Sequence, residues 1–243
     1  MEDGGRNTFA KQYHSIVGKD GDMDMKNTLN PTIFRILGNI KGKNILDLGC
    51  GNGYFSFQLE KKWAKMTGID ISSNLITFAK ETAKKLKYKS EFFVSNAANL
   101  KILKNKKFDI VISNMAFMDI KDIKNTIKEC AKHLIKNWLL LFSIANPIYG
   151  ISERIFDEKQ KKYYLKLEKY GSIYSIQWKN FWTIHHHRPI GFYLTTLIEN
   201  NFKLTSYKEI STLYHQNKIM KDKTLISYKK EIPSFLIIEA KKE

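Results

Sequence analysis

The chain has 243 residues, of which 43% are hydrophobic, and this suits a globular protein with a full buried core. The longest strongly apolar run, residues 138–145, is too short to span a bilayer, and residues 1–5 lack the apolar stretch of a signal peptide, so we expect a cytoplasmic protein. The two cysteines, Cys50 and Cys130, exclude a disulfide framework and a cysteine-based zinc site.

The formal net charge of +17 raises the question of a nucleic-acid partner. Only four of the 41 basic residues are arginines, and the lysines are dispersed along the chain, mostly on the polar faces of predicted helices. Surfaces that bind the phosphates of nucleic acids usually also use the bidentate guanidinium of arginine. We therefore favour a solvated lysine surface, and nucleic acid is a possible but less favoured partner.

Residues 1–26 are polar and dotted with glycine, with one aromatic cluster over residues 9–17. This segment is either a disordered leader or a short helix. A helix would either pack on the sheet edge or fold over the cofactor as a lid, and Tyr13 and His14 are then its functional candidates. A helix follows from Asn30-Pro31, and then strands and helices alternate. The apolar periodicity predicts strands over residues 44–48, 65–69, 91–95, 108–113 and 138–144, and helices over residues 54–62, 74–87 and 120–135. This alternation with short loops predicts a doubly wound, mostly parallel sheet.

Residues 147–187 interrupt the alternation and are rich in tyrosine and tryptophan. The segment is too long for a simple connection, so we predict an insertion over the mouth of the site. A further helix opens at Arg188-Pro189. Strands over residues 202–210 and 235–240, joined by a lysine-rich loop over residues 216–230, predict an antiparallel hairpin at the edge of the sheet. No boundary divides the chain, which we read as a single domain over residues 1–243.

A glycine turn is the strongest local signal in the sequence. Gly49, Gly51 and Gly53 follow a buried strand and precede a helix, an arrangement that lets a ligand approach the backbone and the helix N-terminus. Asp70 ends the next strand about 20 residues later, the spacing at which a dinucleotide fold holds a ribose. A nicotinamide cofactor would favour the third glycine at Tyr54, and an inactive Rossmann domain is a further alternative.

The whole stretch from Asn44 to Phe55, with Asp47 two residues before the first glycine, resembles motif I of the class I S-adenosylmethionine (SAM) methyltransferases. The resemblance covers about residues 29–146, and residues 108–120, 187–189 and 232–238 are similar to small-molecule members of the ubiquinone-biosynthesis-like branch. Residues 114–117 lack the prolines of the amino-methylating DNA motif. The resemblance implies a Rossmann-like fold.

The resemblance also implies a SAM site at the carboxyl ends of the first four strands. The glycine turn and Asp47 would meet the methionine portion, Asp70 the ribose hydroxyls, and the turns after the second and third strands the adenine. The residues expected at the cofactor, with Tyr13 from the N-terminal segment, are Tyr13, Asp47, Gly49, Gly51, Gly53, Asp70, Ile71, Asn96, Ala97 and Asn114.

Methyl transfer from a sulfonium requires alignment of the acceptor, exclusion of water and, for a protonated acceptor, a base. His187 is the first candidate base because the helix at Pro189 would hold it near the pocket mouth, and His14 is the second. The alternative is that residues 185–187 form a loop with one ring buried and two solvated. Adjacent histidines cannot converge on one ion, so no metal site is predicted. Tyr163, Tyr164, Trp178 and Trp182 either line an apolar acceptor pocket or belong to the ordinary core.

The sequence therefore predicts SAM-dependent methyl transfer to an oxygen or nitrogen atom of a small molecule. An RNA methyltransferase that uses the lysine surface would bind with steep salt dependence, and a non-catalytic SAM-binding protein would bind without turnover. We expect a lid segment over residues 1–28, a SAM-binding core over residues 29–146, a substrate-covering insertion over residues 147–187, and a C-terminal helix and hairpin over residues 188–243.

Overall fold

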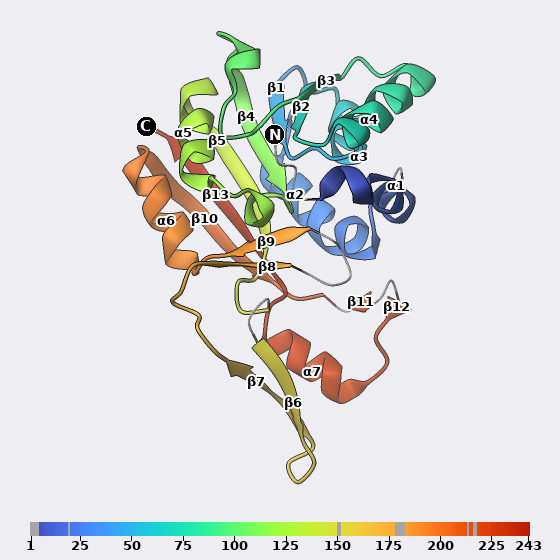
Figure 1. The fold of residues 1–243 in the computed structure, drawn as a ribbon, viewed down its shortest axis with the longest axis vertical. Coiled ribbons are helices and arrows are strands. Elements are labelled where there is room, and N and C mark those ends of the chain that lie inside the picture. Colours follow the sequence, from blue (N-terminus) through green and yellow to red (C-terminus); the bar gives the residue numbers. More distant parts are fainter. Residues whose placement is uncertain (1–4, 19, 150–151, 178–182, 213, 216–217) are drawn as a thin grey trace.

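Seven strands form one sheet in the order β10-β13-β5-β4-β1-β2-β3 (Figure 1). The computed structural model describes residues 5–18, 20–149, 152–177, 183–212, 214–215 and 218–243. The strands of the sheet are β1 (Asn44–Leu48), β2 (Lys65–Asp70), β3 (Glu91–Val94), β4 (Phe108–Asn114), β5 (Leu134–Ala145), β10 (Phe202–Ile210) and β13 (Phe235–Lys242). The first five are parallel, and β13 runs antiparallel to both of its neighbours.

Helices cover both faces of this sheet. The helices of the described chain are α1 (Arg6–Val17), α2 (Asn30–Leu37), α3 (Tyr54–Glu60), α4 (Ser73–Leu86), α5 (Ile123–His133), α6 (Ile190–Glu199) and α7 (Lys223–Glu231), of which α7 lies away from the sheet. A π-helical turn η1 (Met25–Leu29) and 3₁₀ turns η2 (Lys101–Leu103) and η3 (Phe117–Asp119) are also present. Val111 of β4 packs in a core with α5 and α6, whereas Ile110 and Ile112 pack in a second core with α2 and α3. This alternation follows the two-residue repeat of a strand that is buried on both faces.

The predicted fold class is confirmed, and the C-terminal pair β10–β13 is antiparallel as expected. Of this pair, only β10 lies at an edge of the sheet, since β13 lies between β10 and β5. The prediction of a loop over residues 216–230 is wrong in its second half, where α7 forms. Asp222 caps this helix by accepting the N–H groups of Thr224 and Leu225, and a single buried side chain, Tyr228, anchors it. One anchor makes too weak a periodic pattern to detect in the sequence.

The predicted helix over residues 120–135 is too long at both ends. Asp122 accepts the N–H of Asn125 and so caps the helix, which begins at Ile123. β5 starts directly after the helix, at Leu134. The cap and the longer strand together explain the difference.

The insertion consists of two hairpins, β6 (Ser152–Asp157) with β7 (Lys162–Leu167), and β8 (Tyr174–Gln177) with β9 (Ile184–His187). The first hairpin projects away from the sheet beside α7, where the rings of Tyr163 and Tyr228 pack edge to face (Figure 1). β9 packs against η3, which follows β4. A short pair, β11 (Tyr214–His215) and β12 (Lys218–Ile219), precedes α7.

The N-terminal segment is helical in the part that the structure describes. Asn7 of α1 accepts hydrogen bonds from the Ser72 hydroxyl and the Asn74 N–H, so it occupies the N-terminus of α4. The described part of the segment is thus a helix and not a disordered leader, and its action as a lid stays a prediction. Within the described ranges, no helix combines the length and the hydropathy that a membrane crossing requires.

Candidate functional site

The glycine turn between β1 and α3 has left-handed backbone at all three glycines, with φ of 72° at Gly49, 55° at Gly51 and 80° at Gly53. A Cβ atom added to Gly49 would stand 2.3 Å from the Cβ of Ala116, and one on Gly53 would stand 2.9 Å from the ring of Phe92. Glycine is therefore required both by the backbone conformation and by the close approach of Ala116 at Gly49 and of Phe92 at Gly53.

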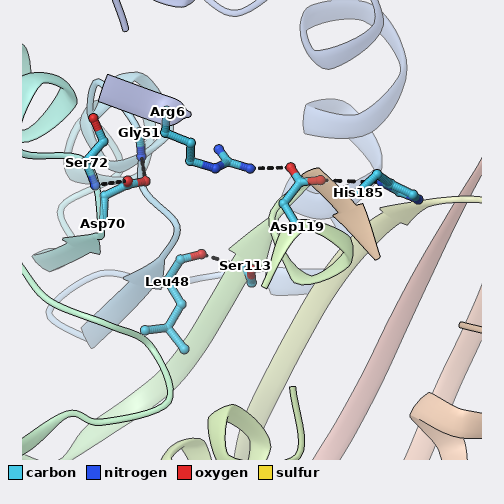
Figure 2. A network of polar contacts seen from close by, with 8 residues as sticks. All are labelled: Arg6, Leu48, Gly51, Asp70, Ser72, Ser113, Asp119 and His185. Atoms are coloured by element: carbon cyan, nitrogen blue, oxygen red, sulfur yellow. Dashed lines mark hydrogen bonds and ion pairs between the residues drawn. The ribbon is translucent and has the colours of Figure 1, made fainter. Parts of the chain in front are cut away.

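Asp70 at the end of β2 is fixed beside this turn. One carboxylate oxygen accepts the N–H of Gly51 at 2.8 Å, and the other accepts the N–H of Ser72 at 2.9 Å (Figure 2). The side chain is buried, so these two backbone donors hold it in one orientation. Each carboxylate oxygen can accept a second hydrogen bond, which is what a diol requires.

Asp47 in β1 lies beneath the turn and is also buried. The Ser56 hydroxyl of α3 donates to its carboxylate at 2.6 Å. Burial raises the pKa of Asp47 to about 7, and the negative charge of Asp70 contributes to the rise, while the bond from Ser56 opposes it. Asp47 therefore changes its charge near neutral pH, and a cation placed next to it would favour the ionised form.

Three segments that are distant in the sequence meet at Asp119 of η3. The Arg6 guanidinium of α1 forms an ion pair with one carboxylate oxygen, and His185 Nδ1 of β9 lies 3.4 Å from the other. Figure 2 shows Arg6 on the side of Asp119 that faces Asp70, and His185 on the opposite side. One carboxylate thus connects the N-terminal helix, the loop after β4 and the insertion.

The two N-terminal candidates both reach the glycine turn, at adjacent residues. The Tyr13 ring faces the glycine turn, since a Cβ on Gly51 would stand 3.2 Å from its ring edge. Burial raises the pKa of Tyr13, so its hydroxyl stays neutral. His14 stacks on Phe78 of α4 with 4.5 Å between ring centroids, and its Nδ1 accepts the Asn52 amide at 3.0 Å.

The remaining predicted cofactor residues lie at the carboxyl ends of β2, β3 and β4. The Ser95 N–H donates to the Asp70 carbonyl at 2.9 Å, which brings the turn with Asn96 and Ala97 beside the end of β2, where Ile71 follows. Ala97 is buried, and the Asn96 side-chain oxygen accepts the Ala98 N–H at 2.9 Å within this turn.

Asn114 has a connecting role that the sequence pattern does not indicate. Its amide donates to the Tyr54 hydroxyl at 3.1 Å and to the Asn30 side chain at 3.3 Å, and its oxygen accepts the Ser143 hydroxyl at 2.6 Å. These bonds join β4 to α2, α3 and β5. The side chain of Asn114 is therefore held by three other elements around the end of β4.

The histidine triplet is a strand rather than the loop considered above, and two of its rings are buried instead of one. His187 is 1% exposed, donates from Nε2 to the Tyr170 carbonyl at 2.9 Å, and packs beside the rings of Tyr170 and Tyr174. Its Nδ1 has no hydrogen-bond partner among the described residues. His186 bonds the Ser175 hydroxyl, and His185 is the member that reaches Asp119. In a strand, alternate side chains share a face, which places His185 and His187 together on the buried side. This arrangement could be inferred only once residues 184–187 were recognised as a strand.

The aromatic residues expected to form an acceptor pocket are only partly located. Tyr163 and Tyr164 lie on the projecting β6–β7 hairpin, whereas Trp178 and Trp182 fall outside the described residues. Within the described ranges, no group of three histidine, cysteine or acidic side chains could hold a metal ion.

Residues 39–201, more than half of the chain, match the family of methyltransferase domains. The chain belongs to this family. A ubiquinone biosynthesis O-methyltransferase of Pelagibacter ubique is 36% identical over 107 residues, which cover 44% of each chain. An S-adenosylmethionine-dependent methyltransferase from Mesorhizobium loti has a TM-score of 0.70 at 20% identity, over 87% of this chain and 96% of its own. Magnesium protoporphyrin IX methyltransferase from Synechocystis PCC 6803, with bound S-adenosylhomocysteine, has a TM-score of 0.64 at 18% identity, over 98% and 96%.

The predicted membership of the SAM-dependent methyltransferases is confirmed, together with the Rossmann-like fold and the cofactor of the family. The chain spans about half the length of the curated relatives it matches. The matched part contains the glycine turn, Asp70 and the strands that position them.

Proposed function

We propose that this chain transfers the methyl group of SAM to an oxygen or nitrogen atom of a small-molecule acceptor. The observation that carries the proposal is the buried Asp70 carboxylate, held by the Gly51 and Ser72 N–H groups at the end of β2 in a methyltransferase family. The O-methyltransferase relative named for ubiquinone biosynthesis supports a small-molecule acceptor.

The residues present fit the cofactor. Asp70 has acceptor capacity for the ribose hydroxyls, and the turn at Gly49, Gly51 and Gly53 gives a ligand access to the backbone. In its ionised form, which a neighbouring cation favours, Asp47 would supply the negative charge that complements the amino group of the methionine portion. Ile71, Asn96, Ala97 and Asn114 lie at the strand ends that would surround the rest of the molecule. When bound, SAM supplies a methyl group on a good leaving group.

The contribution of the chain itself is then to align the acceptor and to exclude water. Arg6 of α1 and His185 of β9 both contact Asp119, so the N-terminal segment and the insertion converge on one point beside the turn. We propose on this basis that residues 1–28 act as a lid, that residues 147–187 cover the acceptor on the core of residues 29–146, and that residues 188–243 complete the sheet.

A base remains a separate proposal. His187 keeps a lone pair on Nδ1 when Nε2–H donates to the Tyr170 carbonyl, which supports a proton-accepting role. His14 has its Nδ1 engaged by Asn52, so Nε2 would have to accept the proton. The role of His187 or His14 as the base stays a prediction. The cytoplasmic location of the protein also stays a prediction.

The test uses methyl-labelled SAM and an extract of the source organism, with Asp70→Ala as the control. Label in the small-molecule fraction that is lost with the variant supports the proposal and identifies the acceptor. Label in RNA favours an RNA methyltransferase instead. Binding of SAM without label in any fraction favours a SAM-binding protein that does not catalyse transfer. Loss of paired, charge-assisted bonds in Asp70→Ala should weaken SAM binding by about 2–3 kcal/mol.

A further inference from the structure

A concave site lies at the amino ends of the parallel strands, on the opposite side of the sheet from the glycine turn at their carboxyl ends. It is a groove of about 710 Å³, and its lining includes Asn44, Lys65 and Phe108, which are the first residues of β1, β2 and β4. At the other end of these strands, Gly49 follows the last residue of β1, and Asp70 is the last residue of β2. We refer to it as the strand-start groove. Its volume is in the range of ligand sites.

The parallel topology concentrates lysines at this groove. Every loop that enters a parallel strand must reach the same edge of the sheet, and each loop that enters β1, β2, β3 or β4 carries at least two lysines. The charged residues that line the groove are Lys65, Lys87, Lys89, Lys106, Lys107, Glu60 and Glu91. Lysines that are dispersed in the sequence are therefore gathered in space.

Both groove carboxylates are already engaged by the protein. Glu60 accepts the N–H groups of Lys89 and Ser90 at 2.6 and 3.0 Å, and Glu91 pairs with Lys106 at 2.5 Å. Five ammonium groups against two carboxylates leave the groove with an excess of positive charge. Such a groove attracts a polyanion, and the attraction weakens with salt.

Trp63 gives the groove an aromatic surface. It is 74% exposed, the highest value among the large hydrophobic side chains that the structure describes, and it lines the groove together with Tyr88. Its φ of 66° is in the left-handed region, and hydrogen bonds fix the turn from both sides, since its N–H donates to the Glu60 carbonyl and its carbonyl accepts the Gly42 N–H, each at 2.8 Å. The indole is therefore presented to solvent by a rigid backbone.

We propose that the strand-start groove binds single-stranded nucleic acid, with a base stacked on Trp63 and phosphates beside the lysines. Stacking on an exposed aromatic residue within a basic groove is the common physical basis of single-strand binding. A duplex keeps its bases stacked on one another, so it cannot use the indole face in this way. The site lies across the sheet from Asp70, and the inference does not depend on the proposed methyl transfer.

The test is fluorescence anisotropy with a labelled oligouridylate, repeated over a salt series. Trp63→Ala should weaken binding about tenfold. Lys65→Gln combined with Lys89→Gln should reduce the slope of log affinity against log salt by about 1.4, as expected for two lost phosphate contacts on a single strand. Lys159→Gln combined with Lys162→Gln, on and beside the projecting β6–β7 hairpin, removes the same charge elsewhere and should leave the slope unchanged. Circular dichroism and thermal unfolding verify that each variant is folded.

Two results would overturn the proposal. If Trp63→Ala binds the oligouridylate as tightly as the wild type does, no base stacks on Trp63. If inorganic polyphosphate then displaces the oligouridylate as well as unlabelled oligouridylate does, the groove is a surface that binds any polyanion. If the hairpin control lowers the slope as much as the groove pair does, binding follows net charge and no groove is involved. Displacement by oligouridylate but not by a duplex of equal length would support the single-stranded assignment.

Discussion

Replacing Asp47 with asparagine tests the electrostatics beneath the glycine turn. The amide keeps the shape of the side chain and an acceptor for the Ser56 hydroxyl, and it removes the ionisable group. Burial raises the pKa of Asp47 from 3.8 to about 7. At 1.36 kcal/mol per unit of pKa, ionisation of Asp47 therefore lowers the free energy of unfolding by at most about 4 kcal/mol.

The direction of the pH effect follows from the raised pKa. The unfolded chain releases the Asp47 proton near pH 4, whereas the folded chain keeps it until about pH 7, so the free energy of unfolding contributed by this group falls over that interval and is level above it. Asparagine has no such loss. The Asp47→Asn variant should match the wild type near pH 4 and exceed its free energy of unfolding at pH 8, by no more than about 4 kcal/mol.

The measurement is urea unfolding without SAM at several values between pH 4.5 and 8, followed by circular dichroism. Ser56→Ala provides a second variant, because loss of the bond that lowers the pKa of Asp47 should move the end of the pH-dependent interval upward. A stability difference between wild type and Asp47→Asn that does not change with pH, or an asparagine variant that is less stable at pH 8, would refute the reasoning.

The same residue links stability to the proposed cofactor site. If Asp47 complements the amino group of SAM, the wild-type affinity should rise up to tenfold per unit between pH 5 and 7 and then level off, because binding favours the ionised form. Asp47→Asn should bind more weakly and without this dependence. Calorimetric titration across the interval measures both. An asparagine variant that binds SAM as well as the wild type would show that the carboxylate does not contact the ligand.

Three further predictions concern single contacts. Gly49→Ala should lower the free energy of unfolding by about 2–3 kcal/mol, because the φ of 72° at Gly49 and the 2.3 Å approach to Ala116 both oppose a Cβ atom. Thermal unfolding measures this, and Gly171→Ala is the control, because no atom lies within 4 Å of a Cβ atom there. Arg6→Gln leaves Asp119 without its guanidinium partner and should cost about 3 kcal/mol, with faster proteolysis of α1; unchanged proteolysis would contradict this. His187→Gln should lower methyl transfer at least 100-fold with normal SAM binding if the residue is the base, whereas retained turnover would exclude that role.

Local sequence signals were sufficient for the core of this protein. The buried strand before Gly49, the left-handed glycines and the acid that ends β2 depend on φ preferences and on apolar spacing over a few residues. These signals predicted the alternating fold and the glycine turn with Asp70 after the next strand, and the resemblance of residues 44–55 to motif I predicted the family. They failed for α7, whose one buried side chain, Tyr228, packs on Tyr163, 65 residues earlier in the chain.

Contacts between distant segments were decided by the tertiary structure alone. His185 meets Asp119 because β9 packs on η3, and Asn114 is engaged because α2, α3 and β5 surround the end of β4. The lysines before β1 to β4 form one basic edge because parallel strands all begin on the same side of the sheet. Local propensity acts within a few residues, so it specifies elements and turns. The partners of a side chain across the fold depend on chain topology and packing, which no short stretch of sequence contains.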